Sequence, residues 1–488
     1  MSTFLLDDAR MKKLHELLFC FLITIFFFGI NFLPEFATDT YATFQISHWQ
    51  WMLYGNGRIV TAFVYFIIEW LSLSPNTIYA LSYLGAVVFL ALSTYMVSRV
   101  LSRYSGRSIL NICISFLTVA NIFSIEYFLF IEKALFLFAL FLNTLAFASM
   151  ECFFRKKKKR NLCYSFLCLL TAVFIYQITL GLFVILCLPF ICLHSKTLKQ
   201  FVCNNIIVAL LYGTNLLIAL ITTRYLLNSQ RIATNMDIDL STIIRKLIDV
   251  TMNTNGILPK GCFILILLFI LIIYGIVICH SSEKTIFLLR LFYITLGTIM
   301  VGFLPFYSGI SANYCPRVLY PYACLSGILL INLTVSNECE KQHNRFLSSR
   351  VIIFAVTLFA LFCQYFSFLN IFIDRYKCNQ TDKYISEMIA ERIEEYENES
   401  HNVIEYICFY KDASPSYNHR DLNSSNLSPR AAITNWSDLN SLNYYLNTSY
   451  VKGEPDPSYQ AYFEKRNWDT YSDSQLIFDE NTLHICVY

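Results

Sequence analysis

Hydrophobic residues occur along this chain in long blocks that are separated by short polar connections. Blocks of this length with few charges are typical of helices that cross a bilayer, whose hydrocarbon core needs about 20 helical residues. The pattern predicts a polytopic α-helical membrane protein with about eleven transmembrane helices. The predicted spans run from Leu17 to Leu33, Thr77 to Val97, Ser108 to Phe123, Ala134 to Met150, Leu162 to Ile175, Ile178 to Leu193, Val202 to Leu220, Cys262 to Cys279, Ile286 to Leu304, Val318 to Leu333 and Val351 to Ile373.

Basic residues cluster in the connections between these blocks. If the predicted segments cross, the basic connections all face one side, which the positive-inside rule identifies as cytoplasmic. The segment Ile59 to Leu71 is also apolar, but a crossing there would turn the later basic connections outward. We therefore predict that it lies along the membrane surface within the first outer loop. The basic residues are Arg10, Lys12, Lys13, Arg99, Arg103, Arg107, Arg155 to Arg160, Lys196, Lys199, Lys284, Lys341, Arg345 and Arg350.

The composition of the chain changes at about Asp374, which predicts a domain boundary. Residues 1–373 would form the transmembrane domain, with a first outer loop at 34–76, and residues 374–488 a domain on the outer side. The tail opens with an expected amphipathic helix behind an Asn379 and Asp382 capping pattern. Its apolar face is formed by Ile385, Met388, Ile389 and Tyr396.

Further along the tail, short apolar runs predict a small α/β domain. We expect a helix at Trp436 to Leu446. Two of the three tail cysteines could pair in an oxidising compartment, or all three could remain free thiols. The expected strands are Val403 to Tyr410, Gln475 to Phe478 and Leu483 to Tyr488, and the cysteines are Cys378, Cys408 and Cys486.

Composition excludes several classes of protein. Of the 488 residues, 56% are hydrophobic and 15% charged, which argues against a soluble enzyme with a large core. The basic run Arg155 to Arg160 lies between two spans, so it is read as a topology anchor and not as a nucleic-acid patch. We expect the first helix to be retained, because no small-residue cleavage site follows Leu33. The 17 cysteines show no metal-ligand spacing, so neither a metal nor another cofactor is expected.

The first outer loop carries the most informative polar residues. It holds Asp39, His48 and Arg58 at the membrane edge, where ionisable groups are costly and are therefore commonly kept for function. A substrate with a polar head and a lipid tail, such as a lipid-phosphate sugar donor, suits this position. Transfer from such a donor needs a carboxylate to take a proton from the acceptor and a cation to hold the phosphate. Asp39 and Arg58 are the candidates for these two roles. Each also fits a role outside catalysis. Asp39 could be a solvated loop acid or a helix cap, and Arg58 could extend its guanidinium toward the lipid headgroups.

Other candidates have weaker patterns. Glu35 is a second possible catalytic acid or a plain helix-end acid. His48, Trp49 and Trp51 would form a sugar platform or an interfacial aromatic belt. Glu132 and Lys133 would bind the donor or pair with each other at the surface. Arg317 faces outward against the positive-inside trend, which makes it a candidate phosphate ligand.

Several motifs together resemble a known enzyme family. They are TDTY at 38–41, GNGR at 55–58, PRVLYP at 316–321, the run from Ile373 to Glu395 and EYICFY at 405–410. In this layout the chain resembles the membrane-embedded O-antigen glucosyltransferases of bacteria and temperate phages, the serotype-converting enzymes.

The resemblance implies a fold of the GT-C type in the bacterial inner membrane, with a cytoplasmic N-terminus. It implies that glucose is transferred from polyprenyl-phosphate glucose to a lipid-linked O-antigen repeat on the periplasmic side. It further implies inversion at the anomeric carbon without a nucleotide sugar or an obligatory metal.

Other functions remain open at this stage. An O-antigen polymerase, or a transferase acting on another polyprenyl-linked sugar, would use the same lipid chemistry. A lipid or solute transporter is disfavoured, because the chain has only 15 glycines and shows no internal repeat with broken helices at matching positions. A non-catalytic scaffold would leave Asp39 and Arg58 replaceable. The transferred sugar, the acceptor hydroxyl and the linkage cannot be read from the sequence.

Overall fold

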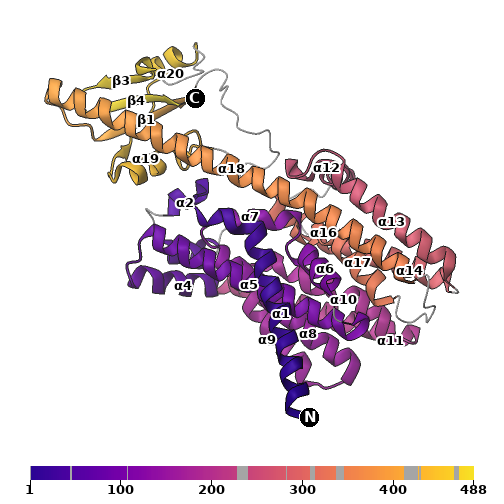
Figure 1. The fold of residues 1–488 in the computed structure, drawn as a ribbon. Helices are drawn as coiled ribbons and strands as arrows, with labels where there is room; N and C mark the ends of the chain where they lie inside the picture. The colour runs from indigo at the N-terminus through magenta and orange to yellow at the C-terminus, as the bar shows by residue number, and fades with distance from the viewer. Residues whose placement is uncertain are drawn as a thin grey trace. The chain divides into compact units, whose positions relative to one another are not determined.

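The computed structural model describes residues 2–43, 47–106, 108–227, 240–281, 283–307, 314–336, 346–411, 427, 430–465 and 472–487. The chain divides into two compact units, which are described separately (Figure 1). Unit 1 comprises Met1–Phe32, His48–Phe128 and Glu132–Leu369. Unit 2 comprises Leu33–Ser47, Leu129–Ile131 and Asn370–Tyr488. The segment that carries Asp39 therefore groups with the tail.

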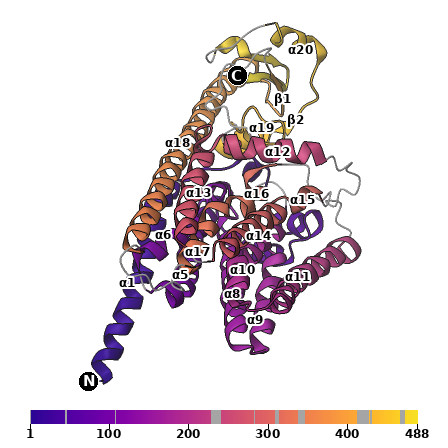
Figure 2. The same ribbon diagram turned by 90° about the vertical axis from the view of Figure 1, so that its right-hand side faces the viewer.

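Unit 1 is built from helices joined by short 3₁₀ and π turns. The helices α10, α14 and α17 lie side by side in both views (Figure 1 and Figure 2). The helices are α1 (Ser2–Phe28), α3 (His48–Gln50), α4 (Ile59–Trp70), α5 (Pro75–Ser105), α6 (Ile109–Val119), α7 (Ile125–Leu129), α8 (Lys133–Lys156), α9 (Arg160–Val173), α10 (Leu180–His194), α11 (Leu198–Ile221), α12 (Leu240–Asn253), α13 (Cys262–His280), α14 (Lys284–Gly302), α15 (Leu304–Tyr307), α16 (Pro316–Ala323), α17 (Leu325–Ser336) and the first part of α18 (Phe346–Ser400).

The described residues confirm a polytopic helical membrane protein. They contain nine helices that are long and apolar enough to cross a membrane, or ten if the bent pair Ile109–Val119 and Ile122–Leu129 counts as one span. The prediction of about eleven spans is higher, because it included Leu162 to Ile175. That region forms α9, which has 14 residues. The apolar segment at Ile59 forms α4, which has 12 residues, fewer than the roughly 20 that a straight span needs.

Contacts within unit 1 show which helix ends lie together. Ala134 donates its backbone N–H to Ser82 Oγ at 3.1 Å, near the start of both α8 and α5. At the far ends of the same helices, the Tyr104 hydroxyl donates to Glu151 Oε1 at 2.5 Å. The two helices are therefore parallel, and the intervening bent pair must return to the starting end. We call these two ends of the unit the Lys133 end and the Glu151 end.

The short helix α9 runs between the Glu151 end and the Lys133 end of unit 1. It follows the C-terminal end of α8, and its Ser165 hydroxyl donates to the Ala146 carbonyl at 2.8 Å. Just beyond α9, the ring of Tyr176 lies 5.0 Å from that of Phe136, close to the start of α8. Despite its length, this segment therefore passes from the Glu151 end back to the Lys133 end, as expected for the predicted span.

Three arginines from the predicted basic connections have their partners at the Glu151 end. Arg103 and Arg155 both pair with Glu151, which is fully buried. The Arg350 guanidinium donates to the Ser105 carbonyl at 3.5 Å. Arg103, Arg155 and Arg350, which come from three of the predicted basic connections, thus lie at the same end of the unit.

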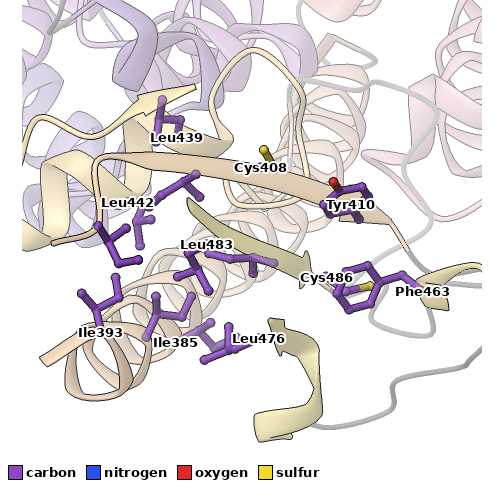
Figure 3. Close-up of a cluster of buried hydrophobic side chains, with 14 residues drawn as sticks. Ile385, Ile393, Cys408, Tyr410, Leu439, Leu442, Phe463, Leu476, Leu483 and Cys486 are labelled. Atoms are coloured by element: carbon purple, nitrogen blue, oxygen red, sulfur yellow. The ribbon is translucent and has the colours of Figure 1, made fainter. Parts of the chain in front are cut away.

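Unit 2 contains a four-stranded sheet of order β2-β1-β4-β3. β1 runs parallel to both β2 and β4, whereas β3 and β4 are antiparallel. Figure 3 shows side chains of α18, α19 and the sheet meeting in one apolar core, among them Ile385, Leu442 and Leu483. The elements are α2 (Thr38–Thr43), the second part of α18, β1 (Tyr406–Lys411), α19 (Asp438–Leu446), β2 (Val451–Lys452), α20 (Pro457–Phe463), β3 (Leu476–Asp479) and β4 (Thr482–Val487).

One prediction for the tail is wrong. The helix does not begin at an Asn379 and Asp382 cap, because α18 continues without a break from Phe346 to Ser400. Both residues are buried and bind other parts of unit 2. Asn379 Oδ1 accepts from the backbone N–H of Phe36 at 2.8 Å, and Asp382 Oδ1 accepts from Arg430 Nε at 2.7 Å. The residue types that cap helices also serve as buried acceptors.

The remaining tail predictions fall close to observed elements. The three predicted strands overlap β1, β3 and β4, and the predicted helix overlaps α19. β2 and α20 were not predicted. The cysteines Cys378, Cys408 and Cys486 are buried, and none of them forms a disulfide with another described residue.

Candidate functional site

A group of buried polar side chains lies at the Lys133 end of unit 1. We call His48, Arg58, Glu132 and Lys133 the polar cluster. Each is at most 8% exposed. Burying such groups is costly unless they are paired, so each requires specific partners.

The centre of the polar cluster is a contact between His48 and Glu132. His48 Nε2 lies 3.1 Å from Glu132 Oε1. Because a carboxylate can only accept, this ring nitrogen carries the proton and donates. The ring of Tyr65 packs against the imidazole at 3.9 Å in a T-shaped arrangement, which fixes its plane.

The charges nearby keep Glu132 ionised. Burial raises the pKa of its carboxyl, but the hydrogen bond and charge of His48 and the charge of Arg58 oppose that effect, and the net result is a lowered pKa. Burial, with the charge of Glu132, raises the pKa of the Tyr65 phenol well above its ordinary value. At neutral pH the tyrosine is therefore neutral and the glutamate is charged.

Arg58 is held by its own loop and by aromatic rings. Its guanidinium lies over the ring of Tyr176 at 4.6 Å and near that of Phe136 at 5.9 Å. The preceding Gly57 has φ +65, and a Cβ there would lie 2.5 Å from the Thr223 side chain. The GNGR sequence is thus suited to bring the backbone close to Thr223 and direct Arg58 inward.

Lys133 begins α8 and is fully buried. Its Nζ donates to Asn31 Oδ1 at 2.8 Å and lies 3.6 Å from the centre of the Tyr79 ring. Tyr79 in turn donates its hydroxyl to the Asn31 carbonyl at 2.7 Å. The reading of Glu132 and Lys133 as a self-paired surface couple is therefore wrong, since both are buried and each binds a different partner.

Arg317 lies beside the polar cluster in a second ion pair. Its Nη1 lies 3.1 Å from Glu126 Oε1, and its backbone N–H donates to Glu126 Oε2 at 2.5 Å. The adjacent Tyr127 donates its hydroxyl to the Arg317 carbonyl at 3.1 Å, and its ring contacts those of Phe136 and Tyr176. The two rings that hold Arg58 therefore also adjoin the Arg317 ion pair.

The two candidate tryptophans have different surroundings. Trp49 packs beside Tyr65, and its backbone N–H donates to Glu69 Oε1 at 3.1 Å. Trp51 is 54% exposed and lies against Gly55 in a short π-helix. Trp49 thus supports a ring that contacts His48.

Asp39 and Glu35 belong to unit 2. Asp39 lies in the first turn of α2, and its Oδ1 accepts from the indole N–H of Trp436 at 3.0 Å. Glu35 is 2% exposed. Nearby, Tyr41 donates its hydroxyl to Asn379 Oδ1 at 3.0 Å, which joins this segment to α18.

The structure therefore brings together three predicted site residues, Arg58, Glu132 and Lys133. It adds His48, which the sequence reading left in an aromatic belt, and Glu126, which it missed. The available signal was an acid and a histidine in outer loops between apolar blocks, but nothing local identified their partners. Comparisons with known protein families, curated proteins and solved structures found no match.

Proposed function

We propose that this protein is a membrane-embedded glycosyltransferase that moves a hexose from a polyprenyl-phosphate carrier to a lipid-linked O-antigen repeat. The resemblance to the O-antigen glucosyltransferases suggests that this hexose is glucose. One observation carries the proposal, the buried polar cluster at the Lys133 end of a bundle of apolar helices. It combines a guanidinium, an ammonium and an ion-paired imidazole next to helix faces that suit a lipid tail.

The cluster fits the chemistry of a lipid-phosphate donor. A guanidinium matches the geometry of phosphate oxygens, and its position over Tyr176 limits the rotamer entropy lost on binding. The rings of Tyr176 and Phe136 also offer apolar faces to a sugar or an isoprenoid unit. As the sugar leaves, negative charge grows on the phosphate, and fixed cations stabilise that charge best where water is excluded.

In the proposed reaction the acceptor hydroxyl attacks the anomeric carbon, and the bonding electron pair leaves with the phosphate. Arg58 and Lys133 offset the developing charge. Asp39 is the proposed base for the hydroxyl proton, with Glu35 as the second carboxylate candidate. Arg317 is proposed to support the phosphate end of the site.

The proposal also assigns an orientation. The Lys133 end would face the periplasm of a bacterial inner membrane, because Arg103, Arg155 and Arg350 of the basic connections lie at the Glu151 end and basic connections favour the cytoplasm. The N-terminus would then be cytoplasmic and unit 2 periplasmic.

Expression in a host with one defined O-antigen tests the proposal. The polysaccharide should gain one hexose per repeat, seen by mass and linkage analysis. Arg58→Ala should lose the modification, whereas the exposed Arg160→Ala should keep it at equal membrane abundance. An unmodified polysaccharide in the presence of abundant, inserted wild-type protein would reject the transferase.

A further inference from the structure

His48 is a buried imidazole for which the sequence analysis proposed no part in proton transfer. The side chain is 4% exposed and sits in α3, a single turn at the start of unit 1's second segment. Its Nε2 is committed to Glu132 at 3.1 Å. Its other ring nitrogen, Nδ1, is also buried and has no hydrogen-bond partner among the described residues.

An imidazole kept only for packing would be expected to have each buried nitrogen satisfied, because an unmade hydrogen bond costs about 1–3 kcal/mol. Here the Glu132 carboxylate binds Nε2, and the Tyr65 ring, which packs edge-on against the imidazole, fixes the plane of the ring. Nδ1 is left without a hydrogen-bond partner among the described residues. Such an orientation is what a proton-transferring histidine requires.

Side chains of different charge surround the imidazole. Glu132 faces the imidazole directly and remains ionised, so it accepts the Nε2 hydrogen bond. Tyr65 also faces it and stays neutral, and Glu69 binds the next backbone N–H at Trp49. The positive charge of Arg58 also acts on Glu132 and helps to lower the pKa of its carboxyl.

We propose that His48 is the general acid of the transfer, donating the Nδ1 proton to the departing phosphate while Glu132 positions the ring. This inference rests on the proposed function. When the bond between the anomeric carbon and the phosphate oxygen breaks, its electron pair stays on that oxygen. The Nδ1 proton moves to the phosphate, which leaves as its monoanion, and the imidazole becomes neutral. The acceptor oxygen bonds to the anomeric carbon and gives its proton to the base, and exchange with water restores both groups.

The test measures transfer from polyprenyl-phosphate glucose in isolated membranes at equal protein abundance. His48→Gln should lower the rate about a hundredfold, the lower end for a positioned acid. The exposed His15→Gln is the matched control and should keep the wild-type rate. Added imidazole should partly restore His48→Ala, by filling the space left by the ring, but should not restore Arg58→Ala.

The pH profile separates an acid from a structural residue. Wild-type transfer should fall as the pH rises, because the imidazolium is lost, and His48→Gln should lack that limb. Two results would overturn the role of His48 as general acid without contradicting the proposed transferase function. One is a wild-type rate that falls only toward low pH, and the other is a His48→Gln protein with the wild-type rate and pH profile. No transfer by wild type or by His15→Gln would instead reject the proposed function itself.

Discussion

The ion pair between Arg317 and Glu126 gives a quantitative test of how this site is built. The sequence suggests that Arg317 is a phosphate ligand, whereas the structure pairs it with a carboxylate that is fully buried. The perturbation is Arg317→Met, which keeps most of the side-chain volume and removes the guanidinium. Glu126 would keep the backbone N–H of residue 317 as a donor, at 2.5 Å, but lose the Nη1 contact at 3.1 Å.

The expected cost follows from burial. Removing one partner of a buried ion pair costs about 3–5 kcal/mol, because the other charge stays in a medium of low dielectric. The Arg317 side chain is 16% exposed, so we expect about 3 kcal/mol for Arg317→Met. Glu126→Gln should cost a similar amount. The double variant should cost less than either single change, because no uncompensated charge remains.

Equilibrium unfolding in mixed detergent and SDS, followed by tryptophan fluorescence, measures these free energies. Arg160→Ala, at an exposed position, is the control and should stay within about 0.5 kcal/mol of the wild type. Additive single costs in the double variant would refute the pairing argument. Transfer activity then separates the roles of Arg317. A double variant that is stable and active makes the arginine structural, and one that is stable but inactive makes it a substrate ligand.

Three further predictions concern the other residues. Arg58→Ala should reduce transfer at least about a hundredfold, and Arg58→Lys less, because lysine keeps the charge but not the paired donors; initial rates in membranes decide this. Asp39→Asn should lower transfer roughly a hundredfold to ten-thousandfold if it is the base, and an unchanged polysaccharide would leave Asp39 only as the acceptor for the Trp436 indole. Burial lowers the pKa of His484, whose Nδ1 lies 2.9 Å from the Tyr410 hydroxyl. The unfolded chain then binds this proton at higher pH than the folded one, so stability of the sheet falls as pH drops below the ordinary histidine range. Hydrogen exchange of β1 and β4 at about pH 5 and 7.5 should show faster opening at the lower value, and equal protection after correction for intrinsic rates would contradict this.

Helices and spans were accessible from the sequence because bilayer solubility is a property of each segment alone. The strand at Tyr406 and the helix at Asp438 were likewise close to their predicted positions, since each has a local apolar period. The cap predicted at Asn379 and Asp382 failed for the opposite reason. A local pattern suggested a helix start, but distant partners in unit 2 use both side chains as acceptors, and the helix continues through them.

The sequence by itself determined that this protein is a multi-pass helical bundle with ionisable residues in the connections between its apolar blocks. It also determined that Arg58, Glu132 and Lys133 were candidates, because charges beside apolar blocks are costly enough to be informative. Only the tertiary structure decided which of them meet. His48 and Glu132 are 84 positions apart, and Arg317 and Glu126 are 191 apart. Such pairings depend on how helices pack, which no local period encodes, and burial then turns a pair of ordinary side chains into an oriented site.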